Sequence, residues 1–184
     1  CEHYYRPKGA DIGFDPAQRV GREDVRRLQT RNFAQVTTML GADAGVSPTR
    51  WQKAGYPDAL RQKIGVIHEG IDTEFCRPDA DGRFTLPDGQ VLKAGDRVVT
   101  YASRHLEPYR GFPQFMRAAA QLARRDRLVT FVVAGADGTA YGADPTDGRS
   151  WREVMLAETG IDPSRIHFVG TLSHDRLIQL FQVS

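Results

Sequence analysis

Two arginines that follow a predicted strand are the residues best suited to bind a phosphorylated ligand. Arg104 and Arg110 flank the segment 105–109, and Gly111 comes directly after them. A guanidinium group presents a planar fork of N–H donors that matches phosphate oxygens, and a glycine lets the backbone approach a ligand closely. A helix that begins after this loop would add its unpaired N–H groups and the positive end of its dipole. The segment is interpreted as a diphosphate clamp, with two solvated loop arginines as the alternative.

Two glycine-containing turns further along the chain could contribute to the same site. Their residues are Gly135, Asp137 and Gly138 in the first, and Gly170, Thr171 and Leu172 in the second. The first could cradle a phosphate or a sugar, but its glycines lack the G-x-G-x-x-G spacing of a nicotinamide dinucleotide site. The second could admit a flat base close to the backbone. Both also fit plain turns between a strand and a helix, and this alternative stays open.

Other classes of site find no support in the residue types. The 5 histidines show no H-x-x-x-H or H-E-x-x-H spacing, so we expect no metal site. Cys1 and Cys76 are the only cysteines, which excludes a disulfide scaffold and suits a reducing compartment. The 25 basic residues against 23 acidic ones give a net charge of +2, so the charge does not indicate a nucleic-acid partner. No apolar run approaches the ~18 residues of a membrane helix.

Alternating strands and helices must position these loops. The hydrophobic pattern predicts strands at 97–102, 128–134 and 166–169, and helices at 113–125, 151–159 and 175–183. Continuous apolar strands separated by helices indicate a parallel sheet that is covered on both faces. In such a sheet, ligands bind at the carboxyl ends of the strands. The fold class is therefore predicted to be α/β, with Rossmann-like parallel sheets and all three loops at one edge.

The first half of the chain predicts a long helix and then short elements. The helix covers residues 22–40, and its apolar stripe consists of Val25, Leu28, Phe33, Val36 and Leu40. A brief strand is expected at 64–67. Residues 78–96 are polar and rich in turns, and Asp-Gly at 88–89 between two alternating segments predicts a β-hairpin there. Because neither end of the sequence carries a start or stop signal, we expect a piece of a longer protein that is truncated at both ends.

Five segments, in this order, resemble the group 1 (family 4) glycosyltransferases. They are VSPTRWQ at 46–52, IGVIHEGIDTEFCRP at 64–78, SRHLEPYRGF at 103–112, VVAGADG at 132–138 and HFVGTL at 167–172. The resemblance implies part of a GT-B fold, in which two Rossmann-like domains face each other. It assigns residues 1–70 to the end of the acceptor domain, 71–96 to an interdomain crossover with a hairpin insert, and 97–184 to the first half of the nucleotide-sugar domain.

The resemblance also implies roles for particular residues. Arg104 matches the family's diphosphate-binding arginine, whereas Arg110 stands where a lysine is common. Gly135 and Gly138 match the family's glycine turn, and Leu172 lies where the backbone often touches the base. The family's pair of glutamates would lie beyond Ser184, so no catalytic residue is assigned.

The implied activity is transfer of a hexose-type sugar from a nucleotide-sugar donor to a glycan, lipid-linked or small-molecule acceptor. The family implies retention at the sugar, no required metal and no other cofactor. It implies a role in bacterial polysaccharide biosynthesis in the cytoplasm, with peripheral attachment to the inner face of the membrane through segments outside this sequence. The piece by itself is expected to be inactive. The alternative is a non-catalytic Rossmann-like module that binds a nucleotide or serves as a structural unit. A nicotinamide-dependent oxidoreductase is disfavoured by the glycine spacing.

Overall fold

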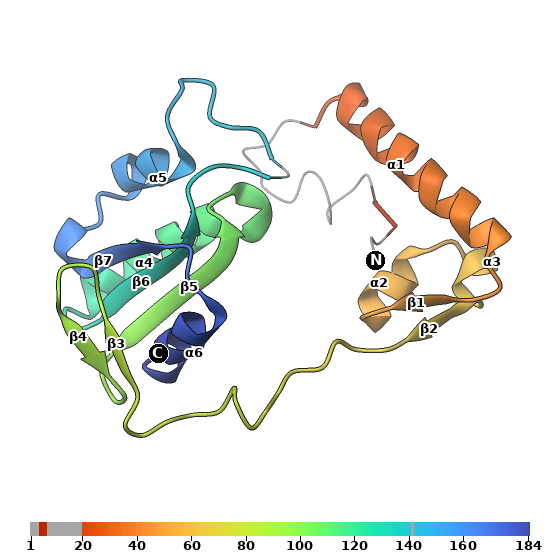
Figure 1. Ribbon diagram of the computed structural model, residues 1–184. Coiled ribbons are helices and arrows are strands. Elements are labelled where there is room, and N and C mark those ends of the chain that lie inside the picture. Colours follow the sequence, from red (N-terminus) through yellow and green to blue (C-terminus); the bar gives the residue numbers. More distant parts are fainter. Residues whose placement is uncertain (1–3, 7–19, 141) are drawn as a thin grey trace. The chain divides into compact units, whose positions relative to one another are not determined.

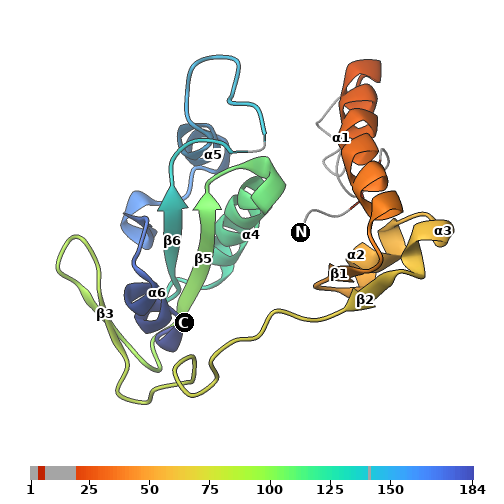
Figure 2. The same cartoon turned by 45° about the vertical axis from the view of Figure 1, so that its right-hand side comes forward.

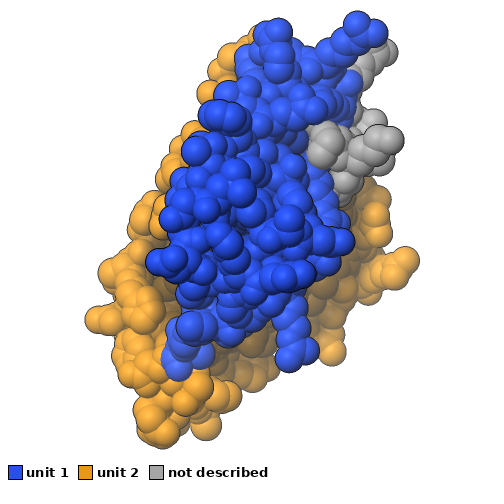
Figure 3. All heavy atoms as spheres, turned by 90° about the vertical axis from the view of Figure 1, so that its right-hand side faces the viewer, with its two compact units in different colours: residues 1–71 blue, residues 72–184 orange. Residues whose placement is uncertain are grey.

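The structure is a computed structural model that describes residues 4–6, 20–140 and 142–184. The chain divides into two compact units, residues 1–71 and 72–184, which Figure 3 distinguishes by colour. Residues 1–3 and 7–19, which fall in the segment assigned to the acceptor domain, lie outside the described residues. The assignment of 1–70, 71–96 and 97–184 to parts of a GT-B protein stays a prediction.

Over its described residues, the first unit contains three helices and a two-stranded parallel sheet. Its elements are α1 (Arg22–Gly41), β1 (Gly45–Ser47), α2 (Arg50–Gly55), α3 (Asp58–Arg61) and β2 (Ile64–Val66). Tyr56, Leu60 and Ile64 form its buried core. Lys63 donates hydrogen bonds to the main-chain oxygens of Met39, Leu40 and Ala42, so its ammonium group caps the carbonyl end of α1.

The long helix is confirmed, but the predicted apolar stripe is wrong for two of its residues. Phe33 is 73% exposed and Leu40 is 66% exposed, whereas Leu28 and Asn32 are the buried residues of α1. The Asn32 amide donates to the main-chain oxygen of Tyr5 at 2.7 Å and accepts from its N–H at 2.8 Å. The buried face of α1 is therefore fixed by a polar contact with a distant segment. The spacing of apolar residues in the sequence gives no sign of such a contact.

The second unit has a hairpin followed by a parallel α/β unit (Figure 1). Its elements are β3 (Arg83–Thr85), β4 (Val91–Lys93), β5 (Val98–His105), η1 (Pro108–Arg110), α4 (Phe112–Arg125), β6 (Thr130–Ala136), α5 (Trp151–Thr159), η2 (Pro163–Arg165), β7 (Ile166–Gly170) and α6 (His174–Gln182). β3 and β4 pair antiparallel, which confirms the predicted hairpin. β5, β6 and β7 form a parallel sheet, as the sequence predicts, and the structure gives its order as β5-β6-β7.

Side chains of β6 alternate between two apolar cores, because successive residues of a strand point to opposite faces. Phe131 and Val133 pack with residues of α4 and α5, among them Met116. Val132 and Ala134 pack on the other face with residues of the hairpin and of α6. Figures 1 and 2 show α4 and α6 on opposite faces of the sheet. The predicted sheet with both faces covered is confirmed for this unit.

The hairpin belongs to the core of the second unit. Phe84 is buried with Leu180 of α6 in one apolar cluster. Arg176, also on α6, lies with its guanidinium carbon 4.4 Å from the centre of the Phe84 ring and donates a 3.1 Å hydrogen bond to the main-chain oxygen of Thr85. The hairpin and the last helix therefore cover one face of the sheet together.

Candidate functional site

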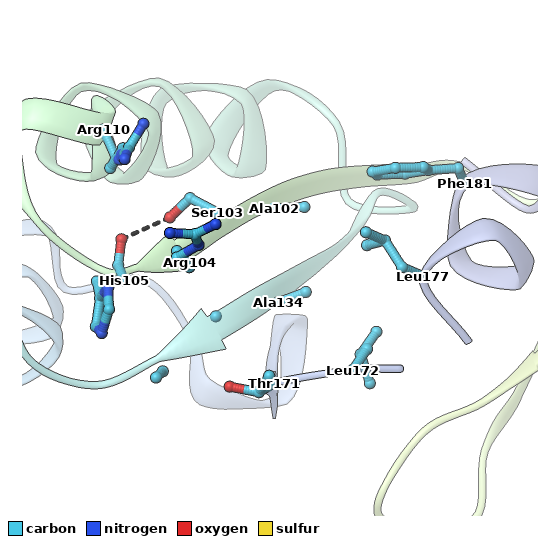
Figure 4. A pocket seen from close by; sticks show the side chains of 12 residues that line it. Ala102, Ser103, Arg104, His105, Arg110, Ala134, Thr171, Leu172, Leu177 and Phe181 are labelled. Carbon is cyan, nitrogen blue, oxygen red and sulfur yellow. Dashed lines mark hydrogen bonds between the residues drawn. The ribbon is translucent and has the colours of Figure 1, made fainter. Parts of the chain in front are cut away.

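A pocket of about 790 Å³ opens at the carboxyl ends of β5 and β6 (Figure 4). Its lining consists of Ala102, Ser103, Arg104, His105, Arg110, Ala134, Gly135, Ala136, Thr171, Leu172, Leu177 and Phe181. These residues come from β5, η1, β6, the turn after β7 and α6. The pocket therefore lies where ligands bind in open parallel sheets.

The structure brings five of the nine predicted site residues into one pocket, namely Arg104, Arg110, Gly135, Thr171 and Leu172. The other four are Gly111, Asp137, Gly138 and Gly170, and they are not part of its lining. Gly111 has φ 75° and precedes α4, and Gly170 has φ 68° at the end of β7, so both fit the alternative of a glycine required by a turn. The Asp137 carboxylate lies 3.6 Å from Arg152.

Strand β5 extends further than predicted and carries Arg104 itself. It continues to His105, and its pairing with β6 shifts in register between Ala102 and His105. The Ser103 hydroxyl donates a 2.5 Å hydrogen bond to the main-chain oxygen of His105 across this irregularity. Such bulges re-aim side chains at the rims of sheets. Arg104 is therefore held by a strand rather than by the loop that the sequence predicted.

The start of α4 supplies fewer unpaired N–H groups than the sequence suggested. A 3₁₀ turn, η1, comes before the helix. The N–H of Gly111 donates to the main-chain oxygen of Pro108 at 2.9 Å, and the N–H of Phe112 donates to the main-chain oxygen of Glu107 at 3.3 Å. Pro113 has no N–H to offer. Attraction for an anion at this edge therefore depends mainly on the two arginine side chains.

Gly135 is required by a close approach between neighbouring strands. A Cβ atom at this position would lie 2.7 Å from the main-chain oxygen of Ser103 and 3.0 Å from Cδ2 of Leu106. Both distances are shorter than normal van der Waals contacts. The glycine therefore brings the end of β6 against the bulged end of β5 and shapes the floor of the pocket.

Tyr101 supports the arginine end of the pocket and was not identified from the sequence. Its hydroxyl donates to the main-chain oxygen of Arg110 at 3.0 Å and lies 3.2 Å from the Ser103 Oγ. Burial raises the pKa of Tyr101 above its usual value, so this hydroxyl keeps its proton at neutral pH. Its ring contacts Phe112 and Phe115 of α4. The aromatic pattern alone does not distinguish this role from ordinary core packing.

Glu107 is the second supporting residue that the sequence analysis missed. Its side chain is fully buried, and its Oε2 accepts hydrogen bonds from the N–H groups of Ala140 at 3.1 Å and Gly142 at 3.0 Å. Its Oε1 lies 3.9 Å from Nε of Arg110. A glutamate between Leu106 and Pro108 gives no sequence signal of burial, since glutamates are mostly exposed.

The pocket has a polar end and an apolar end. Figure 4 shows Arg104 and Arg110 on one side, and Leu172, Leu177 and Phe181 on the other. Leu177 and Phe181 were not predicted as site residues, although their spacing of i and i+4 places them on one face of α6. The arrangement can hold a ligand that carries negative charge at one end and an apolar or flat group at the other.

In residues 4–6, 20–140 and 142–184, no group of three or more His, Cys, Asp or Glu side chains could hold a metal ion. Over the same residues, no helix has the length and apolar character required to cross a bilayer.

Comparison with known proteins supports the resemblance to glycosyltransferases from two directions. Residues 1–76 match the family model described as Glycosyl transferase family 4 group. The structure is similar to the crystal structure of TarM with a TM-score of 0.52 and 13% sequence identity. The similarity covers 92% of this chain but 28% of the TarM chain. No curated protein matches the sequence.

These findings confirm the resemblance to the family 4 glycosyltransferases and the predicted fold class. TarM is a GT-B glycosyltransferase, and the likeness to it identifies the fold of this chain as part of a Rossmann-like GT-B fold. The family match covers the first unit and a few residues beyond, whereas the pocket lies in the second unit.

Proposed function

We propose that the protein transfers a sugar from a nucleotide-sugar donor and that the second unit binds the donor diphosphate through Arg104 and Arg110. The observation that carries this proposal is the pocket that joins both arginines to Gly135, Thr171 and Leu172 at the carboxyl edge of the sheet. Two guanidinium groups at one end of a pocket match the charge and the geometry of a diphosphate. The apolar end, with Leu172, Leu177 and Phe181, suits the nucleoside part of the donor.

The two arginines would act on the leaving group. When the bond between the sugar and the phosphate breaks, negative charge develops on the departing nucleoside diphosphate. Positively charged donors that are already in place stabilise this charge without reorganising. They accelerate the reaction because they bind the developing charge more strongly than the intact donor. This role needs no proton transfer from the arginines.

The finer features of the activity belong to the same proposal and are supported by the family likeness alone. The acceptor would be a glycan, a lipid-linked sugar or a small molecule, and the sugar a hexose transferred with retention. The reaction would require no metal or other cofactor and would take place in the cytoplasm, including the inner face of the membrane. The residues of the acceptor site and the catalytic carboxylates are left unassigned.

Binding of nucleoside diphosphates tests the donor site directly. The full-length protein is titrated by calorimetry with UDP, GDP and ADP, and the titrations are repeated for Arg104→Ala, Arg110→Ala and Arg127→Ala. Arg127 is an exposed arginine of the same unit that does not line the pocket, so its variant controls for the loss of one charge. A hydrogen bond to a charged group contributes about 1.5–3 kcal/mol, so each pocket variant should bind at least about tenfold more weakly.

The outcomes separate the donor site from its alternatives. Binding of one nucleotide that is lost in both pocket variants and kept in Arg127→Ala supports the proposal and identifies the base. Equal affinities in all four proteins would refute the arginine clamp. Tight binding of a nucleotide without any release of sugar from the matching nucleotide sugar would favour a non-catalytic nucleotide-binding module.

A further inference from the structure

We propose that Glu107 is a positioning residue that holds Arg110 and the loop after β6 in the arrangement that binds the donor diphosphate. The inference rests on the proposed function, since it concerns the same pocket. It starts from the burial of a carboxylate between two segments that reach the pocket. Glu107 is the only acidic residue with a buried side chain among the described residues.

A buried carboxylate needs polar partners, because moving its charge out of water costs free energy unless protein groups replace the lost water contacts. The partners of Glu107 come from both sides of the site. Its Oε2 accepts the N–H groups of Ala140 and Gly142, and its Oε1 lies 3.9 Å from the Arg110 guanidinium. The same residue also accepts, through its main-chain oxygen, hydrogen bonds from Arg110 at 3.1 Å and Phe112 at 3.3 Å.

The contacts to Ala140 and Gly142 attach the long loop between β6 and α5 to the turn after β5. This loop begins at the end of β6, where Gly135 and Ala136 line the pocket. A Cβ atom at Gly142 would lie 3.6 Å from Oε2 of Glu107 and 3.4 Å from the Tyr109 ring, so the backbone passes close to both side chains. One carboxylate oxygen therefore fixes the middle of a loop that is rich in small residues.

The contact to Arg110 orients a group that reaches the pocket. The Arg110 side chain is about 42% exposed and lines the pocket, whereas the carboxylate that it faces is fully buried. A flexible arginine loses rotamer entropy when it binds a phosphate, and a contact that restricts it beforehand reduces that loss. The main chain of Arg110 is held in the same way, because its oxygen accepts from Tyr101.

These contacts make a specific difference between ligands. Glu107 acts on the arginine end of the pocket, whereas the apolar end is formed by Leu172, Leu177 and Phe181. Loss of the Glu107 charge should therefore weaken the binding of a nucleoside diphosphate much more than the binding of the nucleoside without phosphates. A purely structural residue would affect both ligands equally.

The test uses the full-length protein and the isosteric variant Glu107→Gln. Affinities for the nucleoside diphosphate that binds best, for its nucleoside and for inorganic pyrophosphate are measured by calorimetry. Hydrogen exchange at residues 140–142 and the unfolding temperature are followed in parallel. The matched control is Glu158→Gln, because Glu158 forms an ion pair with Arg117 in the same unit, away from the pocket.

We expect Glu107→Gln to weaken the binding of the nucleoside diphosphate and of pyrophosphate by about tenfold. The affinity for the nucleoside should change by less than about twofold, and amide hydrogen exchange at 140–142 should become faster. In an Arg110→Ala background, Glu107→Gln should lower the affinity for the diphosphate little further, because the two residues act together. The inference would be overturned if Glu107→Gln lowered the affinity for all three ligands equally. It would also be overturned if the losses of binding free energy caused by Glu107→Gln and Arg110→Ala were fully additive. If Glu107→Gln does not fold, Glu107→Asp replaces it, with the same ligand selectivity expected because its carboxylate is set back by one methylene group.

Failure of the proposed function gives a different result. If the unmodified protein binds no nucleoside diphosphate and no pyrophosphate, the donor site itself is wrong, and the positioning role falls with it. If the unmodified protein binds and Glu107→Gln binds equally well, the donor site stands and only the role of Glu107 is refuted.

Discussion

The hydroxyl of Tyr101 donates a 3.0 Å hydrogen bond to the main-chain oxygen of Arg110. This contact joins the middle of β5 to the turn that presents the second arginine of the pocket. Tyr101 and Glu107 therefore hold Arg110 from two sides, one through its main chain and the other through its side chain. Neither residue lines the pocket itself.

Tyr101→Phe should lower both stability and affinity. The variant keeps the ring contacts with Phe112 and Phe115 but loses the hydroxyl, which costs about 0.5–1.5 kcal/mol of folding free energy. Binding of the nucleoside diphosphate should weaken several-fold, because the main chain of Arg110 loses its anchor. Tyr56→Phe is the control, since Tyr56 donates to Gln35 at 3.2 Å in the first unit. Urea unfolding measures the change in stability, and calorimetry measures the change in affinity for the nucleoside diphosphate. An unchanged affinity in Tyr101→Phe would contradict the anchoring role.

Gly135→Ala should damage the pocket. The new methyl group would lie 2.7 Å from the main-chain oxygen of Ser103, so β5 and β6 must separate at this point. Overpacking of this kind costs about 1–3 kcal/mol, and nucleotide affinity should fall with it. At Gly70 an added Cβ meets no atom within 4 Å, so Gly70→Ala serves as the control. A fully stable Gly135→Ala protein with normal nucleotide affinity would show that the close approach is not needed.

The start of α5 should make stability depend on pH in the acidic range. The N–H of Ser150 donates to the Glu153 carboxylate at 2.7 Å, and this hydrogen bond lowers the pKa of Glu153 below its usual value. The contribution to stability is therefore fully present above the unfolded pKa of about 4.3 and is lost as the pH falls through the lower folded pKa.

Glu153→Gln isolates this effect from the other carboxylates. The difference in unfolding free energy between the two proteins should be constant at neutral pH and shrink as the pH falls below about 4.3. Thermal unfolding from pH 7 to pH 3 measures it. A difference that stays constant over the whole range would mean that the capping carboxylate contributes no pH-dependent stability.

Phe84→Ala should be among the most destabilising changes in the second unit. The ring is 1% exposed and lies under the guanidinium of Arg176. Removing a buried phenylalanine costs about 3–5 kcal/mol. Leu128→Ala is the control, because Leu128 is 75% exposed and surface substitutions usually change stability by less than about 0.5 kcal/mol. Similar midpoints for the two variants in denaturant would contradict the proposed importance of the hairpin core.

The second unit could be predicted from the sequence because its signals are local and agree with one another. The apolar runs of β6 and β7, the Ser150–Glu153 capping box of α5 and the Asp88-Gly89 turn all lie within a few residues of the elements that they define. The α1 face was predicted wrongly because its burial depends on Asn32, which contacts Tyr5. A polar contact between distant segments leaves no periodic pattern in the sequence.

The site could be predicted only in part, for a related reason. The arginines and Gly135 were found because charge and glycine are visible as residue types. The end of β5 was placed too early, since the bulge that carries Arg104 arises from pairing with β6. Glu107 was missed because its burial follows from a loop more than thirty residues away, whose N–H groups it accepts.

The pairing of the hairpin with α6 has a consequence for how the protein folds during synthesis. Thr85 and Arg176, which are hydrogen-bonded to each other, are separated by 91 positions along the chain. The hairpin can form as soon as its two strands leave the ribosome, but the apolar side of Phe84 has no partner on α6 until the last helix emerges. At about 5–20 residues per second, this exposed interval lasts several seconds. The newly made hairpin therefore keeps the apolar side of Phe84 without its α6 partner, Leu180, until synthesis of this unit is nearly complete.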